Sequence, residues 1–302
     1  MAIAFAFLLG LVVGSFLNVC IARIPEEQSV IAPRSRCPHC FKPIRGRDNI
    51  PLLSWLLLRG RCRDCRARIS LWYPVVELLT GLYFVWCYNA FGLSIIGVKW
   101  LFFGCFLIVL MVTDLRTRLL PDAVTWTGFG VGLAFSAAAP PQSGIASPLI
   151  WRVLHRVPLS AVVGFVDALV GAAFGGLMLY LAGWLYRKWR GREGMGLGDV
   201  KMMAMAGAFL GLRDTFLTIL IGTVLGTVIG LGIVLALYAS GWKGEVARRA
   251  SRRGLGSVSA MRYALASRYQ LPLGTFLGVA ALAVVAFADY ALYWWSLWTI
   301  AR

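Results

Sequence analysis

Two aspartates stand at positions where ionised carboxylates are costly. Asp114 follows the apolar run 100–113, and Asp199 lies in Gly-Leu-Gly-Asp-Val-Lys, residues 196–201, where a charged loop re-enters a hydrophobic segment. Because an acidic side chain near hydrocarbon is expensive, its presence indicates a functional site. Two such residues at one membrane face could share a proton and activate a water molecule. The sequence therefore predicts an aspartyl protease embedded in a membrane.

The expected chemistry depends on how close the two carboxyl groups lie. Two carboxylates a few ångströms apart cannot both ionise easily, so one keeps its proton. The ionised group then acts as general base on water, the protonated group polarises the scissile carbonyl, and the roles reverse as the amine leaves. The pair titrates as a unit, so neither Asp114 nor Asp199 is assigned as the acid or the base.

The neighbours of Asp199 suggest how a substrate reaches it. Gly196 and Gly198 allow a tight backbone and the close approach of an extended peptide. Lys201 could hold a nearby carboxylate ionised or extend to the membrane interface, and we favour the second interpretation. Asp122, after a proline, is expected to be the N-cap of the next span rather than a catalytic acid.

Three other acidic residues fall within apolar spans. Asp167 is expected to pack or to form hydrogen bonds inside the bundle, and Asp289 is expected at the outer interface. Glu77 lies just inside a span, on the side of the large polar loop 21–71, and could contact a ligand. We therefore treat Glu77 as a candidate binding residue.

Four of the seven cysteines form two Cys-x-x-Cys pairs separated by 21 residues, which are Cys37 with Cys40 and Cys62 with Cys65. This spacing is close to that of two-knuckle zinc sites, in which each turn presents two sulfurs. Zinc is favoured over iron, and unliganded thiols or a redox pair are the alternatives. Because four thiolates close the coordination shell, we expect a metal that folds the loop rather than one that catalyses, with His39 facing solvent.

The composition indicates a polytopic membrane protein. The chain has 302 residues, of which 59% are hydrophobic and 14% are charged, and its mean hydropathy is +0.75. Backbone hydrogen bonding in lipid favours helices, and the apolar runs do not alternate as barrel strands do. We predict an all-α fold with about eight transmembrane helices, at approximately 2–20, 72–92, 95–113, 121–139, 159–186, 200–217, 218–239 and 272–298, with only Arg213-Asp214 marking the turn between the sixth and seventh.

The net charge of +17 is explained by topology rather than by nucleic-acid binding. The loops 21–71, 114–121, 187–201 and 240–271 hold eleven, two, five and seven Lys and Arg, against five in the rest of the chain. The positive-inside rule then places these loops in the cytoplasm and both termini outside it. Anionic lipid would attract the same basic residues, whereas loop 240–271 has no predicted role beyond membrane contact.

Taken in order, these motifs resemble the bacterial type IV prepilin peptidases, the leader peptidase/N-methyltransferase family of GxGD aspartyl proteases. The resemblance covers most of the chain: Gly14-Ser15-Phe16-Leu17-Asn18-Val19, Arg23-Ile24-Pro25, both cysteine knuckles, Ile69-Ser70, Tyr73-Pro74, Glu77, Asp114 seven residues before Pro121, and 196–201. The four-residue GxGD motif alone is weak, but the ordered set is specific.

The resemblance implies two reactions at the bacterial inner membrane. The enzyme would cleave the leader of a prepilin or a type II secretion pseudopilin after glycine on the cytoplasmic side, and then methylate the new α-amino group with S-adenosylmethionine. Asp114 and Asp199 match the catalytic pair, and the four cysteines match the metal-binding loop associated with methyl transfer. Residues 1–71 would form the methyltransferase-associated part and residues 72–302 the peptidase bundle.

Two alternatives remain open from the sequence. A peptidase without methyl transfer would have no need of the 21–71 loop, and the chain has no glycine-rich strand–loop–helix of the soluble methyltransferase type. An ion-coupled transporter with a zinc-stabilised cap would use the acids to relay protons. The sequence predicts neither the identity of the pilin nor the oligomeric state.

Overall fold

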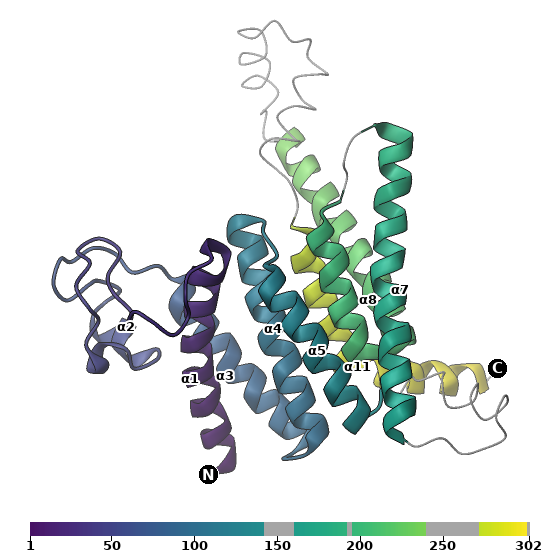
Figure 1. Ribbon diagram of the computed structural model, residues 1–302, viewed down its shortest axis with the longest axis horizontal. Coiled ribbons are helices and arrows are strands. Elements are labelled where there is room, and N and C mark those ends of the chain that lie inside the picture. The colour runs from purple at the N-terminus through teal and green to yellow at the C-terminus, as the bar shows by residue number, and fades with distance from the viewer. Residues whose placement is uncertain (142–159, 192–194, 240–271, 301–302) are drawn as a thin grey trace, which may run out of the picture.

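The computed structural model describes residues 1–141, 160–191, 195–239 and 272–300, and this part of the chain is built from helices. The long helices stand side by side in one bundle (Figure 1). They are α1 (Ala2–Arg23), α3 (Trp72–Phe91), α4 (Ile95–Thr117), α5 (Asp122–Ala138), α7 (Ser160–Arg190), α8 (Leu197–Ala239) and α11 (Leu273–Ile300), with the short α2 (Leu53–Leu57) and the 3-10 turns η1 (Ile24–Glu26) and η2 (Gly46–Asp48) between α1 and α3.

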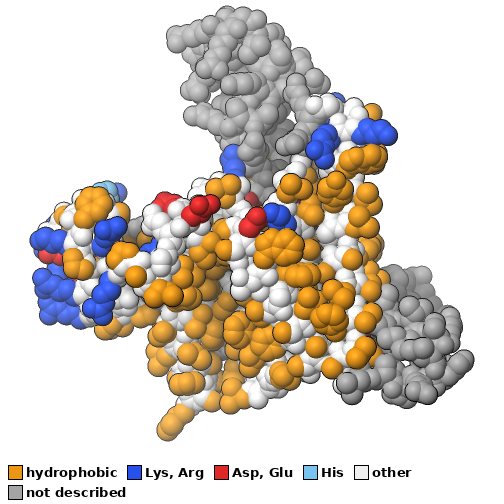
Figure 2. Space-filling model, viewed as in Figure 1, with side chains coloured by type: hydrophobic (Ala, Val, Ile, Leu, Met, Phe, Trp, Pro, Cys, Tyr) orange, Lys and Arg blue, Asp and Glu red, His pale blue; other side chains and the backbone are white. Residues whose placement is uncertain are grey.

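The helices confirm the all-α membrane architecture predicted from the sequence. Nearly all of each predicted span is helical in the described residues. Ala2–Glu26, Ile95–Thr117, Ser160–Arg190 and Leu197–Ile233 are long and apolar enough to cross a membrane by length and composition. Hydrophobic side chains cover much of the visible bundle surface (Figure 2), as expected for helices in contact with lipid.

The predicted pair of spans 200–217 and 218–239 is one helical element, α8, interrupted by a break at Gly211. There φ is 77° and ψ is −178°, a conformation that a residue with a side chain rarely adopts. Atoms of Met203 and Thr215 both lie close to Gly175 of α7, so the chain reverses between them. The sequence analysis therefore misplaced the turn at Arg213-Asp214, because it followed charge rather than glycine.

The first half of α8 is the centre of the bundle. It lies against α5, α7 and α11 as well as α4, and its Met202, Met203 and Phe209 are fully buried. The ring of Phe209 packs on Phe103 of α4, with 4.9 Å between centroids. Asp199 lies three residues before this buried stretch, so dense packing fixes the end of α8 that carries it.

A separate lobe, residues 24–71, lies beside the end of α1 (Figure 1). Lys and Arg side chains gather on it (Figure 2). The basic loop 240–271, for which the sequence predicts only membrane contact, lies outside the described residues.

Candidate active site and metal centre

Asp114 and Asp199 are brought together at one end of the bundle. Asp114 lies in the last turn of α4, where its carbonyl accepts the N–H of Arg118, and Asp199 lies in the first turn of α8. A Cβ placed on Gly274 of α11 would lie 3.0 Å from Oδ2 of Asp114 and 3.2 Å from Oδ1 of Asp199. The two oxygens are therefore no farther apart than the sum of these distances, so one substrate atom or water could contact both carboxyl groups.

Helix α11 also holds Asp114 in place. The N–H of Thr275 donates to Oδ2 of Asp114 at 2.8 Å, and its hydroxyl lies 3.1 Å from the same oxygen. The sequence analysis missed Gly274 and Thr275, which carry no ionisable group. The signal it could have used is the small pair Gly-Thr after Pro272, at the start of an apolar span.

The residues flanking Asp199 have definite partners. A Cβ on Gly198 would lie 2.9 Å from Leu120, so this glycine allows α8 to approach the α4–α5 connection. Lys201 Nζ lies 2.7 Å from both carboxylate oxygens of Asp122, so Lys201 pairs with a nearby carboxylate, which is the interpretation that the sequence analysis ranked second. The N-cap of α5 is Pro121 and Asp122 is already helical, so the predicted N-cap role of Asp122 is wrong.

Glu77 is a buried carboxylate with a backbone partner. Its side chain is in α3, the residue is 7% exposed, and its Oε2 accepts the N–H of Leu52 at 2.9 Å. Leu52 has φ 59° and ψ −51°, a strained conformation for a bulky residue. Gly14 of α1 allows the close approach of α1 and α3, because a Cβ there would lie 2.8 Å from the Cα of Glu77.

The four cysteines of the lobe converge as the spacing predicts. Their sulfur atoms all lie within 4.8 Å of one another, and those of Cys37 and Cys65 are 3.8 Å apart. Four sulfurs bound tetrahedrally at about 2.3 Å from one zinc are separated by about 3.8 Å. The cluster thus has dimensions that fit one tetrahedral metal ion.

The two Cys-x-x-Cys turns have the same pattern of backbone hydrogen bonds. The N–H of Cys37 donates to the carbonyl of Lys42, and the N–H of Cys62 donates to that of Ala67. Each knuckle turns at a residue of positive φ, Phe41 at 57° and Arg66 at 60°. This repetition aims two sulfurs from each turn at one point, and the backbone bridges that close each turn join Arg36 with Pro43 and Arg61 with Arg68.

The thiols of the cluster do not titrate alike. Burial raises the pKa of Cys37, but hydrogen bonds with the backbone of Cys40 and His39 and with neighbouring sulfurs outweigh it and bring the pKa to about 6. A hydrogen bond with the backbone of Ala67 lowers the pKa of Cys65, but burial and the three neighbouring sulfurs raise it to about 11. The sulfurs therefore share protons, which a bound metal would displace.

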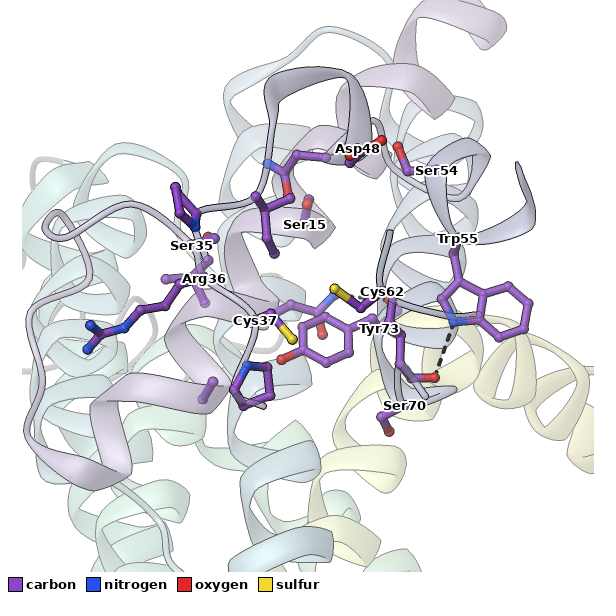
Figure 3. Close-up of a pocket in the computed structure, with 18 of the residues that line it drawn as sticks. Ser15, Ser35, Arg36, Cys37, Asp48, Ser54, Trp55, Cys62, Ser70 and Tyr73 are labelled. Atoms are coloured by element: carbon purple, nitrogen blue, oxygen red, sulfur yellow. Dashed lines mark hydrogen bonds between the residues drawn. The ribbon is translucent and has the colours of Figure 1, made fainter. Parts of the chain in front are cut away.

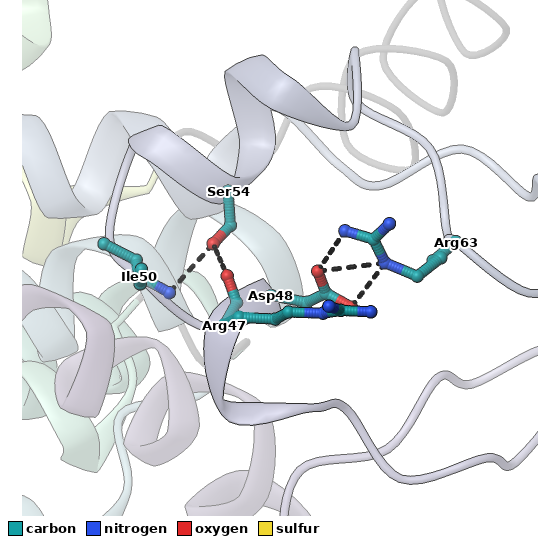
Figure 4. A network of polar contacts seen from close by, with 5 residues as sticks. All are labelled: Arg47, Asp48, Ile50, Ser54 and Arg63. Carbon is teal, nitrogen blue, oxygen red and sulfur yellow. Dashed lines mark hydrogen bonds and ion pairs between the residues drawn. The ribbon is translucent and has the colours of Figure 1, made fainter.

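A polar network fixes the lobe next to the cluster. Asp48 accepts from Arg63, whose Nη2 lies 2.6 Å from Oδ1, and this hydrogen bond lowers the pKa of Asp48 (Figure 4). The hydroxyl of Ser54 accepts from the N–H of Ile50 at 2.9 Å and donates to the carbonyl of Arg47 at 3.0 Å. Because Arg63 lies beside Cys62, this network ties the second knuckle to the turn that precedes α2.

A cavity of about 700 Å³ lies between the lobe and the adjoining parts of α1 and α3. Figure 3 shows residues from α1 (Ser15), the lobe (Cys37 and Cys62) and α3 (Tyr73) around it. Glu77 lines the same cavity. Its volume is within the range of small-molecule sites.

The remaining predicted positions are less informative. Asp167 is buried, in keeping with packing inside the bundle, and the side chain of Asp289 lies outside the described residues. His39 is exposed and is not a member of the sulfur cluster. Cys20, Cys87 and Cys105 are fully or partly buried in helices, as expected of small apolar residues.

Two parts of the chain match models of known protein families. Residues 8–91 match the model of the bacterial peptidase A24 N-terminal domain, and residues 101–231 match that of the type IV leader peptidase family. The first match contains the four cysteines and Glu77, and the second contains Asp114 and Asp199.

Curated relatives agree with these matches. A prepilin leader peptidase/N-methyltransferase of Myxococcus xanthus is 42% identical over 80% of this chain and 66% of its own length. Proteins of the same name from Aeromonas hydrophila and Stutzerimonas stutzeri are 36% and 37% identical, over 76% and 74% of this chain and 80% and 78% of their own lengths. No solved structure matches.

Proposed function

The chain belongs to the type IV leader peptidase family, and we propose that it is a membrane-embedded aspartyl endopeptidase that also methylates its product. Its substrates would be type IV prepilins or type II secretion pseudopilins, cut after glycine on the cytoplasmic side. The relatives' names favour this function over a transporter and favour a bifunctional enzyme over a peptidase alone.

The observation that carries the peptidase proposal is the convergence of Asp114 and Asp199 beside Gly274. One carboxylate takes a proton from water while the other, still protonated, donates to the scissile carbonyl. Thr275 donates twice to Oδ2 of Asp114, so this oxygen is held in place and the other remains available for water or substrate. Gly196 would leave space for an extended substrate backbone, because a Cβ there would meet no atom closer than 3.8 Å, whereas Gly198 is packed against Leu120.

We propose zinc as the metal of Cys37, Cys40, Cys62 and Cys65. The sulfur separations fit one tetrahedral ion, and four thiolates suit zinc better than the oxygen-seeking cations. Bound zinc would supply folding energy to a lobe that has few helical residues. Iron with the same four ligands is the alternative, and metal analysis of the purified protein separates the two.

We place the protein in the bacterial inner membrane with its catalytic end and its lobe in the cytoplasm and both termini outside. The basic loops support this orientation. Residues 1–71 are proposed to serve methyl transfer and 72–302 proteolysis, although Glu77 of the second part lies against Leu52 of the first. We therefore extend the proposed methyl-transfer part to the start of α3.

The test is mass spectrometry of a purified prepilin incubated with the protein, with and without S-adenosylmethionine, beside Asp199→Asn. We expect loss of the leader in both wild-type reactions and a gain of one methyl group only with the donor. The variant should leave the prepilin intact while remaining folded. An uncut prepilin with folded wild-type protein would refute the peptidase proposal, and a cut but unmethylated product would refute methyl transfer.

A further inference from the structure

The cavity between the lobe and helices α1 and α3 has no part in proteolysis as described above. It is about 700 Å³ in volume and is lined by side chains from α1, the lobe and α3, together with Arg116 of α4. The volume would hold a nucleoside-sized molecule together with one end of a peptide. Its walls include Cys37 and Cys62, so metal binding would shape it.

The walls are held by hydrogen bonds rather than by loose contact. Asn18 of α1 donates to the carbonyl of Tyr73 at 3.0 Å, which joins α1 to the start of α3. Arg23 donates to the carbonyls of Ser29 and Pro33 at 2.9 and 2.8 Å, which fixes the start of the lobe against the end of α1. A preorganised cavity of this kind binds a ligand with little ordering cost.

Glu77 stands out among the lining residues. It is buried, and the strained backbone of Leu52 brings an N–H to its Oε2. Strain of this kind persists only where the surrounding structure holds it, and it clusters at functional sites. A buried carboxylate that also lines a cavity is suited to meet a cation or an amine there.

The other lining groups complement a zwitterionic ligand. Arg36 and Arg116 reach the cavity edge and form no ion pair with any described residue, so they are available to a carboxylate. Tyr73 offers an aromatic face to a sulfonium or to a heterocycle. This combination matches an adenosyl sulfonium amino acid better than a purely anionic or purely apolar ligand.

We propose that this cavity is where S-adenosylmethionine and the new pilin N-terminus meet, with Glu77 as the group that receives the amine. This inference rests on the proposed methyl transfer. The amine nitrogen gives its lone pair to the methyl carbon, and the carbon–sulfur bond breaks with its electrons kept by sulfur. The proton displaced from nitrogen passes to the carboxylate of Glu77, and the donor leaves as a neutral thioether.

The position of the cavity explains how the pilin, once cut at the aspartate pair, reaches the methyl-transfer site. Arg116 lines the cavity and lies two residues beyond Asp114 along the chain. The amine freed beside Asp114 and Asp199 therefore arises at the same end of the bundle as the cavity. A displacement along this end would deliver the amine to Glu77 while the apolar segment of the pilin that follows the amine stays among the helices.

The experiment uses the full-length protein in detergent and measures three quantities for each variant: leader cleavage, methyl transfer, and equilibrium binding of labelled S-adenosylmethionine. Glu77→Gln removes the proton acceptor with little change in shape, and Ala22→Phe fills the cavity from α1. Glu27→Gln is the matched control, because it removes the same charge from the lobe outside the cavity lining. Zinc content reports whether each lobe is intact.

We expect Glu77→Gln to lower the methyl-transfer rate by about 100-fold or more, the usual effect of losing a general base, while donor binding persists. Ala22→Phe should weaken donor binding by about tenfold or more because it occupies the space. Glu27→Gln should match wild type in all three measurements.

Two results would overturn the proposal. If wild type binds donor and methylates, yet Glu77→Gln and Ala22→Phe with normal zinc content do the same, the cavity is not the donor site although the function stands. If Glu77→Gln instead raises KM for cleavage, the cavity holds the leader peptide. A wild type that cuts prepilin but never binds donor refutes the methyl-transfer function itself.

Discussion

Replacing Gly274 by alanine should lower catalysis without unfolding the protein. The added methyl carbon would lie 3.0 Å from Oδ2 of Asp114, 3.2 Å from Oδ1 of Asp199 and 3.2 Å from Leu120. These distances are a few tenths of an ångström too short, so the carboxyl groups must move apart. The methyl group would also occupy space through which water approaches the pair.

The magnitude follows from how sharply catalysis depends on position. A displacement of about 1 Å can cost about 100-fold in rate, so a few tenths should lower kcat for leader cleavage by about 10-fold, or ~1.4 kcal/mol in the barrier. Stability should move the other way or stay level, because alanine is preferred over glycine in a helix by up to about 1 kcal/mol. Gly274 is the second residue of α11, so only part of this preference applies to it.

The assay is steady-state leader cleavage in detergent, with thermal unfolding of the same samples. Gly130→Ala in α5 is the matched control, because a Cβ there meets nothing within 4 Å. It should keep full activity. If Gly274→Ala cleaved prepilin at the wild-type rate, the two carboxyl groups could not act together beside α11, and the proposed pair would be wrong.

Three further changes test other contacts of the site and lobe. Thr275→Val removes one of the two donors to Asp114 and should lower kcat by about 10-fold, whereas Thr275→Ser should restore most of it. Cys37→Ser removes one of four thiolates, so the zinc content of the purified protein should fall and methyl transfer should be lost, and normal zinc content would contradict the assigned ligands. The hydrogen bond from Arg63 lowers the pKa of Asp48. The pair therefore stabilises the lobe fully when the pH is above the ordinary pKa of an aspartate, and this contribution is lost as the pH falls through the lowered pKa of Asp48. The urea concentration at which the lobe unfolds should therefore be higher in wild type than in Asp48→Asn at neutral pH, and the two should converge once the pH is below the lowered pKa of Asp48; a difference that persisted in acid would contradict this assignment.

The elements that the sequence predicted well are those fixed by local composition. The apolar spans follow from the cost of unpaired backbone in lipid, and the sulfur cluster follows from two knuckles that each close within six residues, Cys37 to Lys42 and Cys62 to Ala67. The turn inside α8 was misplaced because Arg213 and Asp214 are conspicuous, whereas the backbone reverses at the small residue Gly211.

The contacts that the sequence could not predict join distant segments through the backbone. Thr275 reaches Asp114 across 161 residues and Leu52 reaches Glu77 across 25, and in both the donor is a main-chain N–H that no residue type reveals. Composition shows which carboxylates are costly, but only the packed chain shows which N–H groups hold them. The candidate acids were therefore predictable, and their positioning partners were not.

The ion pair between Lys201 and Asp122 gives these ideas a final test, because it joins the starts of α8 and α5 close to Asp199. The side chains of Lys201 and Asp122 are 33% and 59% exposed, so the pair should add less than about 1 kcal/mol to stability. If its purpose is to hold α8 in register, Lys201→Met and Asp122→Asn should each lower kcat by about fivefold with KM unchanged. Because both break one contact, the double variant should be no slower than either single variant. Rates that multiplied in the double variant would mean that the two residues act separately, with Lys201 serving the membrane interface as its sequence suggested.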